Sequence, residues 1–373
     1  MHAEHEGRRV LMTADAVGGV WDYALQLAEG LGVRGAAVTL ATMGPRPGDD
    51  QRAAARAIPS LRLLESEYRL EWADDPWDDV ARAGSWLLDL EARVQPDIVH
   101  LNGYAHGSLP WSAPTVAVAH SCVCSWWTAV RGGGASSEWD EYRGAVRDGL
   151  QAAGAVVAPS SAMLRALSAH YGAIAGTVVP NGRHAAQFHD GPKGPVILSA
   201  GRLWDEAKNV TALASIASRL PWRVMLAGEA GDAGRSAAPD DAVNYLGRLA
   251  SSEMRAWMAR ASIYVMPARY EPFGLSILEA ALSGCSLVLG DIPSLREHWD
   301  GAAVFVAPDD HEALRAAIQR LIEHPARRME LARRACARGR EFTVERMVDG
   351  YERLYDGLLA PEPGAMEASS CAW

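Results

Sequence analysis

The chain contains 373 residues, 49% of them hydrophobic, and carries a formal net charge of −10 at pH 7. This length exceeds what one hydrophobic core usually serves, so we expect two domains. An acidic chain lacks the excess of Lys and Arg that binds phosphate backbones, which excludes nucleic acid as the main partner.

Cysteine usage and the N-terminal sequence indicate where the protein works. The five cysteines are odd in number and scattered, so we expect a reducing compartment and no disulfide framework. The start, MHAEHEGRRVLMT, holds no apolar stretch of signal-peptide length, and no window approaches the roughly 18 apolar residues of a membrane span. Residues 43–95 are acidic, so membrane contact should be weak and peripheral at most. We expect a cytoplasmic protein whose oligomeric state stays open.

The first half of the chain alternates short apolar runs with longer helical patterns. This alternation is typical of βαβ units and a parallel sheet. The runs expected to form strands are residues 8–13, 37–41, 61–64, 97–101, 115–119 and 155–159. The helical pattern WDYALQLAEGLGVRG follows the first of these runs. The pattern predicts one doubly wound, Rossmann-like α/β domain.

A second series of strands follows a linker. Residues 180–194 are rich in Pro, Gly and polar side chains, as linkers are. The later runs expected to form strands are residues 195–201, 223–228, 243–247, 262–267, 286–291 and 303–308. We place the two domains at residues 1–183 and 184–345 and expect a frayed tail at 363–373. Ligands of open parallel sheets bind outside the carboxyl ends of the strands, so the expected site is the cleft between the domains.

Common catalytic fingerprints are missing from the sequence. Neither G-x-G-x-x-G after a strand nor G-x-x-x-x-G-K-[ST] occurs, which disfavours dehydrogenases and P-loop proteins. H-E-x-x-H and G-x-S-x-G are also missing, which disfavours metalloproteases and α/β-hydrolases.

Two turns after strands carry residues suited to phosphate. Gly18 and Gly19 follow the first strand, where backbone amides can approach a phosphate or sugar without interference from a Cβ; a plain tight turn is the alternative. Arg202 follows a strand, and Lys208 comes six positions later at the start of a helical segment. Two cations beyond the carboxyl ends of a parallel sheet can hold a diphosphate without a metal. The alternative is that both are solvated surface residues.

The stretch ARYEPFGLSILEAALSGCSL places two carboxylates around one turn. Glu271 lies in the loop before a helix that begins near Gly274, and Glu279 lies about a turn into that helix. A carboxylate accepts two O–H bonds, so one glutamate suits ribose and the other a hexose. A helix cap or stabilisation of the helix dipole is the alternative.

These stretches carry a family resemblance. GRLWDEAKN, YEPFGLSILEA and GDIPSLREHW resemble the retaining glycosyltransferases of the GT-B fold in family four, whose mark is the E-x7-E pattern, here Glu271 and Glu279. The resemblance covers almost the whole chain, including DAVGGVWDYALQLA, VVAPSSAML and VVPNGR. It implies an N-terminal acceptor-binding domain and a C-terminal domain that binds a nucleotide sugar.

The resemblance implies a role for each matching residue of the donor site. Arg202 and Lys208 would clamp the donor diphosphate, with Glu279 on the ribose and Glu271 on the transferred sugar. Backbone amides would complete the phosphate cradle at Phe273, Gly274 and Leu275, and from the other domain at Gly18 and Gly19. Together with His120, the histidine that the family places near the reacting centre, Glu271, Arg202 and Lys208 form the expected catalytic set.

The same resemblance implies a domain crossover and marks three departures, one of which is that SCVC follows His120 where acidic or small polar residues are more frequent. A final helix, about residues 346–362, would cross back to the N-terminal domain and pack Tyr351 and Tyr355 there. Pro293, Ser294 and Leu295 replace the family's common glycine pair. The interval between the arginine and the lysine is one residue longer than in many members.

The acceptor side is open to several interpretations. Trp126 and Trp127, beside the glycine-rich loop 131–139, suit an aromatic platform with a mobile lid, or core packing. His106 is a second acceptor candidate, although a lone loop histidine is more often structural. His120, Cys122 and Cys124 alternate as zinc ligands rarely do, so no metal site is expected.

The sequence as a whole predicts a retaining, metal-independent hexosyltransferase without a cofactor, whose partners are a nucleotide-sugar donor and a small-molecule or glycan acceptor. UDP-glucose is the first donor expected from the family, followed by GDP-mannose. A hydrolysing nucleotide-sugar epimerase and a non-catalytic nucleotide-sugar binding protein are the alternatives.

Overall fold

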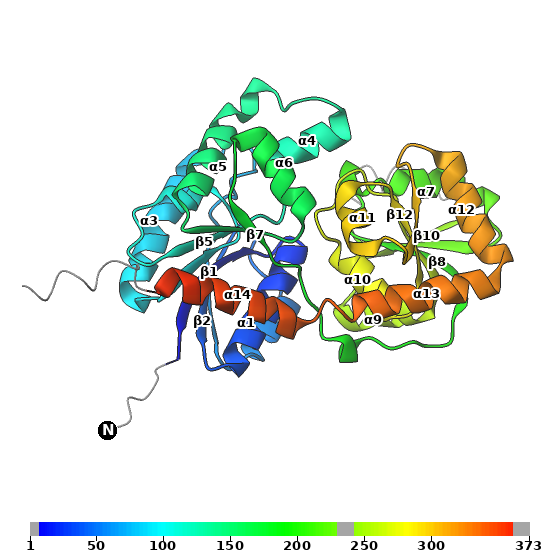
Figure 1. The fold of residues 1–373 in the computed structure, drawn as a ribbon, viewed down its shortest axis with the longest axis horizontal. Helices are drawn as coiled ribbons and strands as arrows, with labels where there is room; N and C mark the ends of the chain where they lie inside the picture. The colour runs from blue at the N-terminus through cyan, green and yellow to red at the C-terminus, as the bar shows by residue number, and fades with distance from the viewer. Residues whose placement is uncertain (1–6, 230–241, 361–373) are drawn as a thin grey trace, which may run out of the picture.

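The computed structural model describes residues 7–229 and 242–360, which form two α/β domains (Figure 1). The N-terminal domain contains a seven-stranded sheet in the order β3-β2-β1-β4-β5-β6-β7, and neighbouring strands are parallel. Its strands are β1 (Arg9–Asp15), β2 (Ala37–Met43), β3 (Leu61–Glu65), β4 (Ile98–Leu101), β5 (Thr115–Val118), β6 (Ala155–Ala158) and β7 (Gly176–Val178).

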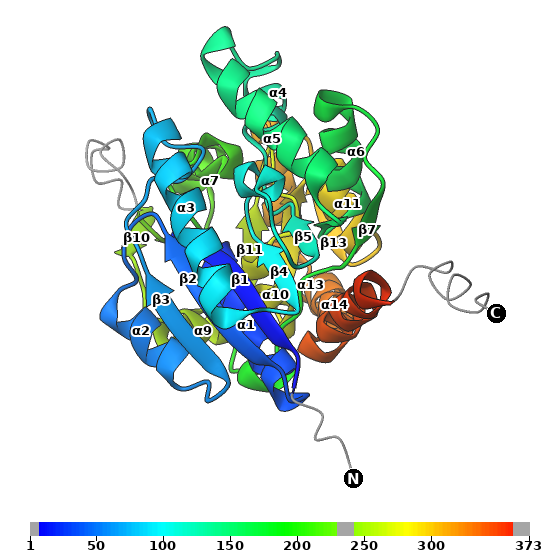
Figure 2. The same ribbon diagram turned by 90° about the vertical axis from the view of Figure 1, so that its left-hand side faces the viewer.

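Helices cover both faces of this sheet (Figure 2). They are α1 (Gly19–Val33), α2 (Asp49–Arg56), α3 (Trp77–Val94), α4 (Val123–Arg131), α5 (Asp140–Ala152) and α6 (Ser161–Tyr171). Helix α1 buries Trp21, Tyr23 and Leu27 because its apolar residues recur at helical spacing. A parallel sheet needs this double cover because both of its faces are apolar.

The C-terminal domain repeats the architecture with a six-stranded parallel sheet in the order β10-β9-β8-β11-β12-β13. Its strands are β8 (Gly194–Ala200), β9 (Arg223–Ala227), β10 (Val243–Gly247), β11 (Ala261–Met266), β12 (Ser286–Gly290) and β13 (Ala303–Val306). Its helices are α7 (Val210–Ile216), α9 (Ser251–Arg260), α10 (Leu275–Leu282), α11 (Pro293–Trp299), α12 (His311–Glu323) and α13 (Pro325–Gly339). Two facing Rossmann-like domains are the GT-B fold that the sequence predicts.

The last helix, α14 (Val344–Leu359), returns to the N-terminal domain and packs beside α1 (Figure 1). Tyr351 and Tyr355 are fully buried in the same apolar cluster as the residues of α1. The Tyr355 hydroxyl hydrogen bonds with His100 Nδ1 at 2.6 Å, and Tyr23 hydrogen bonds with His100 Nε2 at 3.1 Å. A buried polar network therefore anchors this helix.

Each of the strands expected from the sequence overlaps an observed strand, and β7 is a further strand that the sequence did not predict. This three-residue strand lies at the sheet edge, and its first two residues are exposed, so it lacks the apolar signal used to find the others. The domain limits at residues 183 and 345 stay a prediction. The expected tail at 363–373 lies outside the described residues. No helix within the described ranges is long and apolar enough to cross a bilayer.

Candidate active site

Loops that follow the carboxyl ends of the two sheets meet where the domains face each other. Tyr270, after β11, accepts a hydrogen bond from the Cys122 backbone N–H of the other domain at 3.1 Å. Ser160 Oγ, at the start of α6, donates to the Pro272 carbonyl at 3.0 Å. A Cβ on Gly19 would lie 3.4 Å from Leu275 Cδ1. The residues singled out from the sequence gather around this interface.

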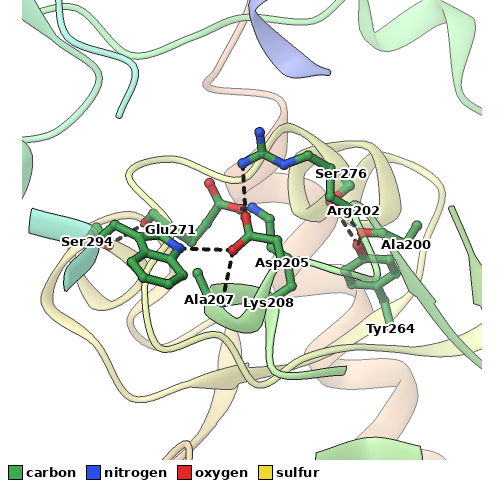
Figure 3. A network of polar contacts seen from close by, with 10 residues as sticks. Ala200, Arg202, Asp205, Ala207, Lys208, Tyr264, Glu271, Ser276 and Ser294 are labelled. Atoms are coloured by element: carbon green, nitrogen blue, oxygen red, sulfur yellow. Dashed lines mark hydrogen bonds and ion pairs between the residues drawn. The ribbon is translucent and has the colours of Figure 1, made fainter. Parts of the chain in front are cut away.

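Lys208 and Glu271 form an ion pair at the centre of the C-terminal wall. Lys208 Nζ lies 2.5 Å from Glu271 Oε2, and both side chains are largely buried (Figure 3). Ser294 Oγ donates to the Glu271 carbonyl at 2.6 Å, so the residue that departs from the family's glycine pair holds the loop of Glu271. Asn209, next to Lys208, adopts φ 53° and donates through Nδ2 to the carbonyls of Pro267 and Pro308. The pair is therefore held in place by its own loops.

Arg202 is held by Asp205, an acid that was not among the residues predicted from the sequence. Arg202 Nη2 donates to Asp205 Oδ2 at 2.9 Å, and Asp205 Oδ1 accepts from the Ala207 N–H at 3.0 Å (Figure 3). Asp205 Oδ1 also accepts from the indole Nε1 of Trp126 at 3.0 Å. Trp126 thus reaches across the interface to the opposite domain. Its indole N–H is committed to Asp205, and its place as an acceptor platform stays a prediction.

The turn between Glu271 and Glu279 has the geometry expected of a close approach. Gly274 is the N-cap of α10 with φ 89°, a conformation that side chains with a Cβ rarely adopt. A Cβ there would lie 2.6 Å from Ile277 Cδ1. Phe273 and Gly274 are buried, and Leu275 begins the helix beside Gly19 of the facing domain.

Glu279 does not share a partner with Glu271. The Nε of Arg183 donates to Glu279 Oε1 at 2.8 Å, and Nη2 lies 3.4 Å from Asp22 Oδ2 on α1. Burial raises the pKa of Glu279, and the Arg183 charge opposes that shift. Arg183 lies in the segment that joins the domains, where its N–H donates to the Phe342 carbonyl at 3.0 Å. The two glutamates therefore serve two separate cation contacts.

His120 lies two residues after the end of β5 and is a neutral, oriented imidazole. Its Nε2 donates to Asn102 Oδ1 at 2.8 Å, and Asn102 Nδ2 in turn donates to the Thr13 carbonyl at 2.7 Å. Burial lowers the pKa of His120 to about 3. The ring packs edge-on against Tyr23 at a centroid distance of 4.5 Å. Nδ1 of His120 takes no part in the hydrogen bonds that join His120, Asn102 and Thr13.

The loop after β1 presents Gly18 and Gly19 to the interface. Gly18 is the N-cap of α1 with φ 98°, and a Cβ on it would meet nothing within 4 Å. The neighbouring Asp15 accepts a hydrogen bond from the Val17 N–H at 2.7 Å, and burial raises its pKa to about 6. Both glycines are exposed.

His106 and Trp127 take different positions. His106 is 9% exposed and donates through Nε2 to the Val80 carbonyl at 3.0 Å, while its ring borders a cavity of the N-terminal domain. Trp127 packs edge-on against Trp126, and the Arg131 guanidinium lies near both indoles. Whether the loop 131–139 moves as a lid stays a prediction.

No metal cluster is found in the described part of the chain: no three His, Cys, Asp or Glu side chains converge there. Cys122 Sγ contacts the Tyr171 hydroxyl at 3.0 Å, in an apolar cluster that also contains Cys124. Metal independence itself stays a prediction.

Several site residues could not be predicted from the sequence, because their partners lie far away in the chain. Arg183 and Asp205 both stand inside quoted stretches, VVPNGR and GRLWDEAKN, and Asp205 lies between the two expected cations. Asn102 follows a strand end, which is the one local signal that could have marked it.

Solved structures with this architecture include glycosyltransferases and a sucrose-phosphate synthase. Sucrose-phosphate synthase from Thermosynechococcus elongatus matches with a TM-score of 0.78 at 20% identity, over 94% of this chain and 99% of that one. HepE from Anabaena in complex with UDP-glucose matches with a TM-score of 0.75 at 17% identity, again over 94% and 99%. At these identities the likeness shows the fold.

Matches to protein families and to sequence relatives define the class of protein more closely. Residues 17–187 match the family described as Glycosyltransferase Family 4, and residues 194–324 match Glycosyl transferases group 1. A D-inositol 3-phosphate glycosyltransferase of Kineococcus radiotolerans is 26% identical over 95% of this chain and 94% of its own length. Glycogen synthase of Mycobacterium tuberculosis is 38% identical over 96 residues, which is 25% of this chain and about a quarter, 23%, of that enzyme.

The two family matches and the fold therefore identify a glycosyltransferase of the GT-B class. The chain belongs to glycosyltransferase family 4.

Proposed function

We propose that the protein is a retaining, metal-independent hexosyltransferase that moves a hexose from a UDP- or GDP-sugar to an acceptor hydroxyl. The observation that carries the proposal is the Lys208–Glu271 ion pair, set beside Arg202 on one wall of the interface and opposite His120 on the other. Tyr270 precedes Glu271, and its contact Cys122 lies two residues after His120, so the two walls meet at the proposed reacting centre.

Charge stabilisation is the main chemistry that these residues offer. When the bond between the anomeric carbon and the diphosphate oxygen breaks, negative charge grows on the leaving diphosphate. Arg202 and Lys208 are already held near that position by Asp205 and Glu271, so little reorganisation is needed. The bound diphosphate would share these cations with the two carboxylates. Amides at Phe273, Gly274 and Leu275, with those of Gly18 and Gly19, would complete the cradle.

The transfer needs no protein nucleophile in this scheme. The acceptor oxygen attacks the anomeric carbon from the face that the diphosphate leaves, and the acceptor proton passes to a diphosphate oxygen. Glu271 binds hydroxyls of the transferred sugar, and neutral His120 contacts the sugar near the reacting centre. Glu279, supported by Arg183, binds the ribose hydroxyls.

UDP-glucose is the first donor to test, because the structurally similar HepE binds it. GDP-mannose is the second, since relatives include O-antigen chain mannosyltransferases. The acceptor binds to the N-terminal domain, with Trp126, Trp127 and His106 as its candidate neighbours.

Mass spectrometry after incubation with UDP-glucose and GDP-mannose, alone and with an acceptor panel, tests the proposal. Lys208→Ala and Glu271→Ala should each lower transfer about 100-fold or more while the protein stays folded. Arg219→Ala is the control: it breaks an exposed ion pair with Glu312, 2.6 Å long, in the same domain and should keep the wild-type rate. Wild-type rates in either site variant would remove the assignment.

The same experiment separates the two alternatives. Free epimerised sugar formed without an acceptor would indicate a hydrolysing epimerase. Tight donor binding without turnover on any acceptor would indicate a binding protein.

A further inference from the structure

A series of hydrogen bonds joins three neighbouring strands of the N-terminal sheet behind His120. Thr13 lies on β1, Asn102 directly follows β4, and His120 lies two residues after the end of β5. These strands are adjacent and parallel, so their carboxyl ends bring the three residues together. The Asn102 backbone N–H donates to Thr13 Oγ1 at 2.9 Å, which fixes the start of the loop after β4. His120 is therefore attached to the sheet through Asn102.

The orientation of the Asn102 carboxamide follows from its contact with the Thr13 carbonyl. A carbonyl oxygen accepts hydrogen bonds and donates none, so the Asn102 amide nitrogen must face it, at 2.7 Å. The other end of the carboxamide, Oδ1, then faces His120 Nε2 at 2.8 Å. Because Oδ1 is an acceptor, the proton of this second hydrogen bond belongs to Nε2. The partners of Asn102 thus determine the tautomer of His120.

The second ring nitrogen of His120 is left as a bare acceptor. A neutral imidazole carries one N–H, and Nε2 has it. Burial lowers the pKa of His120 to about 3, so the ring gains no second proton near pH 7. In the described part of the chain Nδ1 has no hydrogen-bond partner, and His120 is only partly buried. The Nδ1 lone pair is therefore available to a hydroxyl of a ligand.

Tyr23 holds the same ring from one side. The two ring centroids are 4.5 Å apart and the ring planes meet at 65°. Tyr23 is 1% exposed, and its own hydroxyl hydrogen bonds with His100 Nε2 at 3.1 Å, so it cannot easily give way. A half-turn of the His120 ring would place a carbon atom opposite Asn102 Oδ1 and lose that hydrogen bond. Packing and hydrogen bonding therefore favour one orientation of the imidazole.

We propose that Asn102 is a positioning residue of the transfer reaction: it holds His120 in the Nε2–H tautomer, so that Nδ1 accepts a hydrogen bond from a hydroxyl of the transferred sugar. His120 can then accept from the sugar through its ring but cannot donate to it. Asn102 acts through His120 and needs no contact with the sugar. The inference rests on the proposed function, because that function places His120 beside the transferred hexose.

Nitrogen NMR of the full chain tests the tautomer without any ligand. In protein with isotope-labelled histidine rings, long-range correlations from the carbon-bound ring protons distinguish a nitrogen that carries a proton from one that does not. The His120 signals are assigned by their loss in His120→Ala. We expect the proton of wild-type His120 on Nε2. In Asn102→Leu, which nearly keeps the side-chain size but makes no hydrogen bond, the two nitrogen shifts should move toward each other as the Nδ1–H form becomes populated.

Steady-state kinetics of the same variant test the role in transfer. With UDP-glucose or GDP-mannose, whichever the wild-type chain uses, Asn102→Leu should lower kcat/KM about tenfold, the size expected for the loss of one hydrogen bond. Its dissociation constant for UDP or GDP should stay within about twofold, because the nucleotide lacks the sugar that His120 contacts. In a His120→Ala background the same substitution should change kcat/KM less than about twofold, because the residue through which it acts is gone. Gln151→Leu, at an exposed carboxamide on α5, is the matched control and should keep the wild-type rate.

Several results would overturn the inference. These are a proton on Nδ1 of wild-type His120, unchanged ring nitrogen shifts in Asn102→Leu, and a wild-type kcat/KM in that variant or in His120→Ala. An additive loss in the double variant, or a nucleotide affinity that falls in step with kcat/KM, would overturn it as well, because either would indicate a general change of the fold. The wild-type tautomer needs no variant, so it tests the inference even if Asn102→Leu does not fold. A wild-type chain that transfers no hexose and binds neither UDP nor GDP would count against the proposed function, whichever tautomer His120 shows.

Discussion

Replacing Arg183 by Met probes the buried ion pair behind the proposed donor site. The guanidinium is 6% exposed and contacts Glu279 at 2.8 Å and Asp22 at 3.4 Å, so it links the connecting segment to helices of both domains. Met fills much of the volume of the arginine stem but carries no charge. The substitution therefore leaves the desolvated Glu279 carboxylate without its partner.

The cost follows from the exposure of the two acids. Removing one partner of a buried ion pair costs about 3–5 kcal/mol because the remaining charge is uncompensated. The Glu279 side chain is 19% exposed, which places it at the lower end of that range. The Asp22 side chain is 55% exposed, so solvent screens its contact with Arg183 and the loss of that contact adds little. We expect Arg183→Met to lower the free energy of unfolding by about 3 kcal/mol near pH 7.

The pH dependence has a defined sign. Burial already raises the folded-state pKa of Glu279 above its unfolded value, and loss of the Arg183 charge raises it further. A carboxyl group with a raised pKa destabilises the fold above that pKa, and the penalty disappears as the pH falls through it. The deficit of the variant relative to wild type should therefore shrink on acidification.

Urea denaturation at several pH values measures both effects. A double-mutant cycle with Glu279→Gln should give a coupling free energy of at least about 1 kcal/mol, and Arg219→Met, at an exposed pair, should cost less than about 1 kcal/mol. A coupling below about 0.5 kcal/mol, or a deficit that grows as the pH falls, would refute the reasoning.

Three further predictions concern stability and catalysis. Burial lowers the pKa of His100 to about 3 in the folded protein, so the fold must keep this histidine neutral. Protonation below the unfolded-state pKa therefore favours the unfolded chain. Stability should fall as the pH drops below about 6.5, and the slope should lessen by up to about 1.4 kcal/mol per pH unit in His100→Phe; an unchanged slope in urea titrations would contradict this. Gly274→Ala should lower stability by about 1–3 kcal/mol, measured by urea denaturation, because φ is 89° and a Cβ would lie 2.6 Å from Ile277 Cδ1; an unchanged midpoint would show that the turn relaxes freely. Transfer activity should persist in excess EDTA, and recovery of a lost rate on adding a divalent metal would reveal a metal site.

Local pattern predicted the fold well because strand and helix periodicities repeat within a few residues. The runs at 195–201 and 262–267 became β8 and β11 with shifts of one residue. The same reasoning placed Glu271 in a loop and Glu279 in a helix, since a glycine and the start of an apolar period mark where α10 begins. It missed β7, which is too short and too exposed to show a period.

The candidate site was predicted as a set of residue types and not as a set of contacts. Lys208 was expected to meet a diphosphate, and the structure pairs it with Glu271. Trp126 was expected to stack on an acceptor or to lie in the core, and it donates to Asp205 across the interface. An ion pair or hydrogen bond of this kind depends on distances that no local pattern encodes.

The sequence by itself determined the two parallel-sheet domains, the turn around Gly274 and the charges available to a nucleotide sugar, because each is set by neighbours along the chain. Only the tertiary structure decided the partners of those charges. Arg183 and Glu279 are 96 positions apart, and Trp126 and Asp205 are 79 positions apart. The packing of one domain against the other brings such pairs together.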